Sequence, residues 1–203
     1  MKKLKKSTNY NLRTTNLLSG LSLVELLVGF AVLGLMALLV ISIYFADFRL
    51  FSNQNTAIDV ASQNKLALDE VTNQVRQSQS VVTTCTNCSG DTTGSQVLVL
   101  QLWTLNVSGE PADPITNNYD YIVYKRDASD NTKFIRKIVA DGTSSRTSAE
   151  KLIATNISDL IFSYNNVDVT MATEVTVNLT TSAASLNKTH TTTQSAKALL
   201  RNK

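Results

Sequence analysis

The distribution of hydrophobic and polar residues gives the chain an apolar first part. Leu26 to Ala46 form a run of 21 residues without a charged side chain. A helix rises about 1.5 Å per residue, so one of this length reaches about 30 Å, the thickness of a bilayer's hydrocarbon core. A secretory signal peptide is the alternative, but its apolar stretch is typically about 7 to 15 residues long and ends at an A-x-A-like site. No such site ends this run, which therefore predicts one transmembrane helix.

Beyond the apolar run the helical period continues. Apolar residues recur at steps of three, four or seven, and no Pro or Gly interrupts residues 35–80. The apolar positions are Phe48, Phe51, Ile58, Ala61, Leu68, Val71 and Val75. This pattern predicts a single helix of about 55 to 60 residues that ends near Ser80, with a lipid-facing first half and an amphipathic second half.

The rest of the chain has the pattern of short strands. Segments rich in β-branched and aromatic residues alternate with clusters of turn-forming residues. The predicted strands are 97–103, 119–125, 134–139, 157–164 and 173–181. Together with the helix, they predict an α+β fold in which the long N-terminal helix packs on an antiparallel β-sheet head.

The charge is distributed unevenly. Five of the 19 basic residues lie before Gly20, where no acid is present, and the remainder has 14 basic against 16 acidic residues. The basic flank predicts an N-terminus kept in the cytoplasm. The rest of the chain lacks the basic excess of a nucleic-acid-binding surface, so no specific nucleic-acid partner is expected.

The two cysteines form a C-x-x-C motif, Cys85 to Cys88, in a loop rich in Ser, Thr and Gly. A disulfide in an oxidising compartment is favoured over free thiols. With His190 the chain offers at most three N or S ligands for zinc, and Asp127 and Asp130 lie outside any EF-hand pattern. No metal site is predicted.

No catalytic motif is present. His190 lies in a polar run without a nucleophile elbow, and glycine patterns for phosphate or dinucleotide binding are absent. The sequence therefore predicts neither an enzyme nor a cofactor.

Glu25 is the only charged residue between Arg13 and Asp47. An ionisable group in a membrane span costs about 2.5 to 3.5 kcal/mol on insertion scales and is a functional candidate. A simpler interpretation is a capping box, in which Ser22 caps the helix and Glu25 reaches back to the Ser22 N–H. Both interpretations remain open on these residues alone.

The residues around Gly20 form a motif in a defined order. A basic leader is followed by Gly20, an apolar residue, an acid at position 25 and the apolar helix. The stretch "GLSLVELLV" resembles the class III signal of type IV pilins and type II secretion pseudopilins. The resemblance implies that a prepilin peptidase cuts between Gly20 and Leu21, that the new amine of Leu21 is methylated, and that Glu25 acts in filament assembly.

The resemblance also implies an architecture and partners. Its four segments would be a leader that is removed (1–20), a transmembrane and filament-core helix (21–46), an amphipathic helix half (47–80) and a β-rich head (81–203). More loosely, later segments are similar to the minor pilins lettered W and the minor pseudopilins lettered J. The expected function is a minor subunit of a type IV pilus or of a type II secretion or competence pseudopilus. Its partners would be a prepilin peptidase, other pilins, an assembly platform and an ATPase.

The expected location is the cytoplasmic (inner) membrane, crossed once with the N-terminus inside, and then a cell-surface or periplasmic fibre. The alternative is a membrane-anchored extracytoplasmic module that binds DNA, a peptide or a surface ligand. A basic stripe or an aromatic platform would favour that alternative. The net charge of −2 beyond Gly20 and the lone Trp103 do not.

Overall fold

The computed structural model describes residues 22–85, 87–112, 118–186 and 188–201. The chain divides into two compact units, residues 1–47 and 48–203. Helix α1, Leu23–Gln77, contributes to both units. All strands belong to the second unit, and the fold is α+β, as the sequence predicts.

The described part of the first unit is helical from Leu23 to Asp47. Leu and Ala, which favour helix, are common here, and the residues of lowest helix propensity in this segment are Gly29 and Gly34. Every side chain from Ser22 to Asp47 is exposed. The helix in this unit is thus apolar, and none of the described residues covers it.

In the second unit, α1 buries one face. The buried residues are Val60, Asn64, Ala67, Leu68, Val71, Thr72 and Val75. Of the apolar positions expected on the packed face, Leu68, Val71 and Val75 are buried, and Ala61 is half-buried. The prediction was wrong for Phe48, Phe51 and Ile58, which are 54%, 63% and 66% exposed. Each residue turns a helix by about 100°, so Ile58 lies about 200° away from the buried Val60.

The helix ends at Gln77, three residues before the predicted end. The Ser78 hydroxyl donates to the Val75 carbonyl oxygen over 2.7 Å, and the Gln79 N–H donates to the Gln101 carbonyl oxygen over 2.8 Å. The helix does not continue through Gln79, because the N–H group of this residue is bonded to a strand and not to a helix carbonyl oxygen.

The first sheet is an antiparallel meander of five strands in the order β1-β2-β3-β4-β5. The strands are β1 (Ser80–Val81), β2 (Val97–Trp103), β3 (Tyr119–Arg126), β4 (Phe134–Val139) and β5 (Ala149–Ala154). Because neighbours in the sheet are also neighbours in sequence, each connection is a turn or a loop at the sheet's ends.

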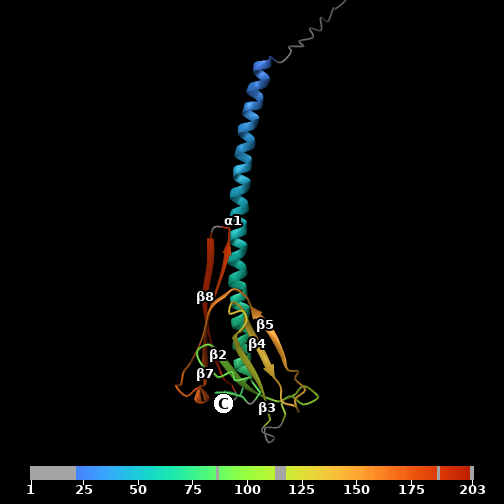
Figure 1. Cartoon of the computed structure of the whole chain (residues 1–203), viewed down its shortest axis with the longest axis vertical. Coiled ribbons are helices and arrows are strands. Elements are labelled where there is room, and N and C mark those ends of the chain that lie inside the picture. Colours follow the sequence, from blue (N-terminus) through green and yellow to red (C-terminus); the bar gives the residue numbers. More distant parts are fainter. Residues whose placement is uncertain (1–21, 86, 113–117, 187, 202–203) are drawn as a thin grey trace, which may run out of the picture. The chain divides into compact units, whose positions relative to one another are not determined.

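The second sheet has three antiparallel strands in the order β6-β7-β8. They are β6 (Ile157–Tyr164), β7 (Glu174–Ser185) and β8 (Lys188–Leu199), and the short 3-10 helix η2 (Val169–Met171) lies between β6 and β7. Figure 1 shows both sheets beside the second half of α1. Buried residues of that half, such as Leu68 and Val71, share one hydrophobic core with residues of both sheets.

The strand predictions were correct for β2, β4 and β6, whose bounds match those expected. Strand β3 runs one residue further, and β7 begins one residue later and continues to Ser185. The sequence did not predict β1, β5 or β8. Strands β5 and β8 lie at sheet edges and expose most of their side chains, so they lack the apolar runs by which buried strands are recognised.

Candidate functional site

The motif that carries the resemblance is partly within the described chain. Gly20 and Leu21, the predicted processing residues, lie outside the described residues. Glu25 lies in the first turn of α1, and its backbone N–H donates to the Ser22 hydroxyl over 3.2 Å. Ser22 therefore caps the helix, as the capping-box interpretation predicts.

Glu25 borders a shallow notch in the helix surface. Its lining is otherwise apolar and comprises Leu26, Gly29, Phe30 and Leu33. Apart from the adjoining backbone of its own helix, a Cβ built on Gly29 would meet no atom of the described residues within 4 Å, so none of them fills the space above that glycine. The arrangement is a carboxylate beside an apolar depression that a second helix could enter.

The helix around Glu25 is long and apolar enough to cross a membrane. From Ser22 to Ala46, Glu25 is the only residue with a formal charge. It forms no ion pair with any residue that the structure describes. In a low-dielectric environment such a carboxylate is costly until a cation or a set of donors faces it.

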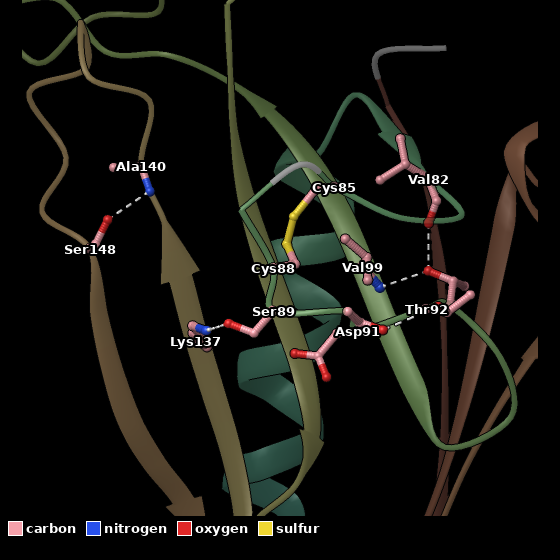
Figure 2. Close-up of a disulfide and its surroundings, with 12 residues drawn as sticks. Val82, Cys85, Cys88, Ser89, Asp91, Thr92, Val99, Lys137, Ala140 and Ser148 are labelled. Carbon is pink, nitrogen blue, oxygen red and sulfur yellow. Dashed lines mark hydrogen bonds between the residues drawn. A yellow bond between two sulfur atoms is a disulfide. The ribbon is translucent and has the colours of Figure 1, made fainter.

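Cys85 and Cys88 are joined by a disulfide, with Cα atoms 5.3 Å apart (Figure 2). Cys88 is fully buried and forms a second, smaller hydrophobic cluster with Val99, Val123 and Val139 of the five-stranded sheet. The disulfide loop therefore covers part of this sheet. Because both sulfurs are bonded to each other, neither is a zinc ligand.

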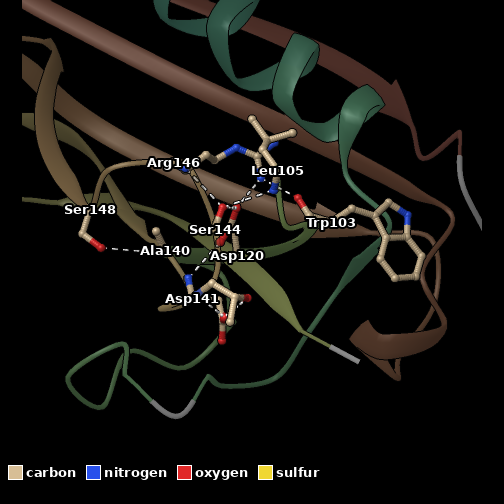
Figure 3. A network of polar contacts seen from close by, with 9 residues as sticks. Trp103, Leu105, Asp120, Ala140, Asp141, Ser144, Arg146 and Ser148 are labelled. Atoms are coloured by element: carbon tan, nitrogen blue, oxygen red, sulfur yellow. Dashed lines mark hydrogen bonds and ion pairs between the residues drawn. The ribbon is translucent and has the colours of Figure 1, made fainter. Parts of the chain in front are cut away.

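A buried carboxylate lies in the head that sequence reasoning did not identify. Asp120 on β3 accepts hydrogen bonds from the Arg146 guanidinium over 2.6 Å, the Ser144 hydroxyl over 2.7 Å and the Asp141 N–H over 2.8 Å (Figure 3). Three donors, one of which is the ion-paired Arg146, satisfy the charge, so the group fixes the 141–146 loop and is not poised for chemistry. A signal existed in the sequence, since Asp120 shares the buried period of β3 with Ile122 and Tyr124.

The carboxylates of Asp127 and Asp130 accept hydrogen bonds from residues of their own loop. Asp127 accepts from the Ser129 N–H and hydroxyl, each over 2.8 Å. Asp130 accepts from the Thr132 N–H and hydroxyl in the same way, and these donors hold the pKa of both carboxyl groups below their ordinary value. Among the described residues, no group of three or more His, Cys, Asp or Glu side chains could hold a metal ion.

No protein-family model matches this chain, and no curated protein matches it. The resemblance to pilins therefore depends on the residues from Gly20 onward and on the arrangement of helix and sheets.

Proposed function

We propose that this chain is a minor pilin or pseudopilin subunit, processed by a prepilin peptidase and assembled into a type IV pilus or a type II secretion or competence pseudopilus. One observation carries the proposal. The first half of α1 exposes apolar side chains on all sides, and one carboxylate, Glu25, lies in its first turn. Such a helix needs a bilayer, other helices, or each in turn.

Both environments suit this helix. A helix satisfies its own backbone hydrogen bonds, which makes it stable in a bilayer. Between helices, packing is favoured where small residues allow close approach. Gly29 and Gly34 provide two such positions, since a Cβ on either would meet no described atom within 4 Å outside the adjoining backbone of its own helix.

Cleavage after Gly20 would give Glu25 a partner. The new amine on Leu21 lies four residues before Glu25, a spacing that allows pairing within one helix. Between protomers, a neighbour's amine could neutralise the carboxylate, and an unpaired carboxylate in the bundle would be costly. We infer that this pairing selects the axial register of neighbouring subunits.

The head supports a location outside the cytoplasm. The Cys85–Cys88 disulfide is typical of oxidising compartments. With the basic flank before Gly20 kept inside, the helix would cross the membrane once and place the β-sheets on the far side.

The alternative, a membrane-anchored binding module, uses the same helix only as an anchor. A plain anchor requires neither Gly20 nor Glu25, so these two residues distinguish the functions. The proposal predicts that both are needed for recovery of the subunit in fibres.

The test compares the wild-type chain with Gly20→Val in its native cell. We expect the wild-type chain in the sheared surface or pseudopilus fraction and the variant only in the membrane, because the peptidase would no longer cut. Gly142→Ala is the matched control, since a Cβ there meets no atom within 4 Å. Recovery of Gly20→Val in fibres at the wild-type level would contradict the proposal.

A further inference from the structure

A pocket of about 520 Å³ lies in the head where α1 ends beside the end of β2. Three arginines reach it from different parts of the chain: Arg76 from the last turn of α1, Arg146 from the loop between β4 and β5, and Arg201 from the segment after β8. Its apolar wall includes Leu102, Trp103 and Leu105. Its volume lies within the range of small-molecule sites.

The pocket has an excess of positive charge. No Asp or Glu is among the described residues that line it. Arg146 is neutralised by the buried Asp120, but neither Arg76 nor Arg201 forms an ion pair within the described chain. Glu174 shares an adjoining depression with both, yet its carboxylate is paired with Lys197 over 2.8 Å.

Stabilisation of the C-terminal end of α1 does not explain why three arginines line this pocket. A cation in the last turn of a helix stabilises the helix dipole, which accounts for Arg76 alone. Arg146 is held rigidly, because it donates both to Asp120 and to the Trp103 carbonyl oxygen, each over 2.6 Å (Figure 3). Arg201 follows a strand and has no helix end to stabilise. Arg76 and Arg201, which have no ion pair among the described residues, lie beside the fixed guanidinium of Arg146 and together form a receptor for an anion.

We propose that this pocket binds an oxyanion, a phosphate or a carboxylate, carried by a ligand with a flat apolar part. Guanidinium groups match the oxygens of both anions with paired hydrogen bonds. The indole of Trp103 and the neighbouring leucines provide a surface on which a planar apolar group can stack. The site lies within the second unit and does not depend on assembly into a fibre.

The test uses the full chain in a non-ionic detergent. Trp103 is the only tryptophan, so its fluorescence, excited at the red edge of its absorption, reports on this pocket. The probes are phenyl phosphate and hippurate, with uncharged hippuramide as the matched control. We expect a saturable change with at least one anion and binding of hippuramide at least about tenfold weaker.

Two variants test the arginines separately, so that a folding defect in one leaves the other informative. Arg76→Gln and Arg201→Gln are each expected to weaken anion binding about tenfold. Lys65→Gln, an exposed cation on the same helix, is expected to bind as the wild type. Circular dichroism verifies that each variant is folded.

Saturation by only one of the two anions supports the proposal and identifies the oxyanion. The proposal is overturned if neither anion gives a saturable change. Equal binding of hippuramide, or wild-type affinity in both arginine variants, would overturn it as well.

Discussion

The two halves of α1 have similar secondary structure and different surroundings. From Leu23 to Asp47 every side chain is exposed, although most are apolar. From Phe48 to Gln77, a stripe of side chains is buried by the chain's own sheets. In the second half of α1, the sheets of the same chain bury the apolar face. The apolar side chains of the first half need a bilayer or other helices to bury them.

The polar groups of the two halves show the same contrast. Asn64 is fully buried, and its amide donates to the Leu179 carbonyl oxygen over 2.9 Å and the Thr192 carbonyl oxygen over 3.0 Å. Glu25 has no ion pair in the part of the chain that is described. The Asn64 amide nitrogen is thus satisfied by groups of the fold, although its buried Oδ1 accepts no hydrogen bond from the described residues. The Glu25 carboxylate is exposed and available for a partner.

The largest expected effect is a difference in the free energy of unfolding between the buried and exposed faces of the second half of α1. Leu68 is 5% exposed and Leu66 is 65% exposed. We expect Leu68→Ala to lower the free energy of unfolding by about 2 to 5 kcal/mol, because it leaves a cavity in the core. Leu66→Ala should change it by less than about 0.5 kcal/mol. Urea unfolding of the full chain in detergent measures both, and equal losses would contradict the assignment of the buried face.

A smaller loss is expected at Asn64. Asn64→Ala removes the donor for two strand carbonyl groups and should lower the free energy of unfolding by about 1 to 3 kcal/mol. Asn73→Ala, at an exposed position of the same helix, is the control and should have little effect. If the two variants unfold at the same urea concentration, the amide does not tie the helix to the second sheet.

Glu25→Ala is expected to impair assembly and leave the stability of the head unchanged, in contrast to the substitutions at Leu68 and Asn64. The urea midpoint of the head should not change, because Glu25 lies outside the second unit. Recovery of the subunit in fibres should fall by about tenfold or more, which corresponds to about 1.4 kcal/mol. Immunoblots of membrane and sheared fractions measure the ratio.

Ser22→Ala distinguishes two possible roles of Glu25, setting the register between subunits and capping the helix. This variant loses the hydroxyl that accepts the Glu25 N–H, at about 1 kcal/mol of helix stability, but it keeps the carboxylate. Incorporation close to the wild type would assign the Glu25 effect to its charge. An equal loss in Ser22→Ala would reduce Glu25 to a capping role.

The smallest effect concerns an exposed loop of the head. Hydrogen bonds from the Ser129 N–H and hydroxyl lower the pKa of Asp127 from its ordinary value of 3.8. Because the folded-state pKa is the lower one, the stabilisation is present above about pH 3.8 and is lost as the pH falls through the folded-state pKa. The wild type should therefore have a small advantage over Asp127→Ala in urea at neutral pH that disappears in acid. An advantage that persists unchanged at the lowest pH would contradict this origin.

Local periodicity was sufficient to predict the helix and the bounds of β2, β4 and β6. The cap at Ser22 was one of two interpretations that the residues Ser22 and Glu25 left open. Periodicity was insufficient for the face of α1, because the exposed Phe51 and Ile58 and the buried Leu68 fit one helical pattern equally well. Only the positions of the sheets decide which residues of that pattern are covered.

Long-range contacts account for the rest. Asp120 and Arg146 lie 26 residues apart in sequence, and their 2.6 Å ion pair follows from the path of the loop between β4 and β5. The sequence also presented Trp103 as an isolated aromatic residue. In the fold its ring centroid lies 5.1 Å from that of Tyr119, and its side chain borders the arginine pocket.

The central claim is that the apolar half of α1 is a processed filament helix. Intact-mass and N-terminal peptide analysis of the protein from its native membrane or sheared surface fraction tests it most directly. The account predicts a chain that begins at Leu21, with or without one added methyl group. A chain that retains residues 1–20 would contradict it and leave an ordinary membrane anchor.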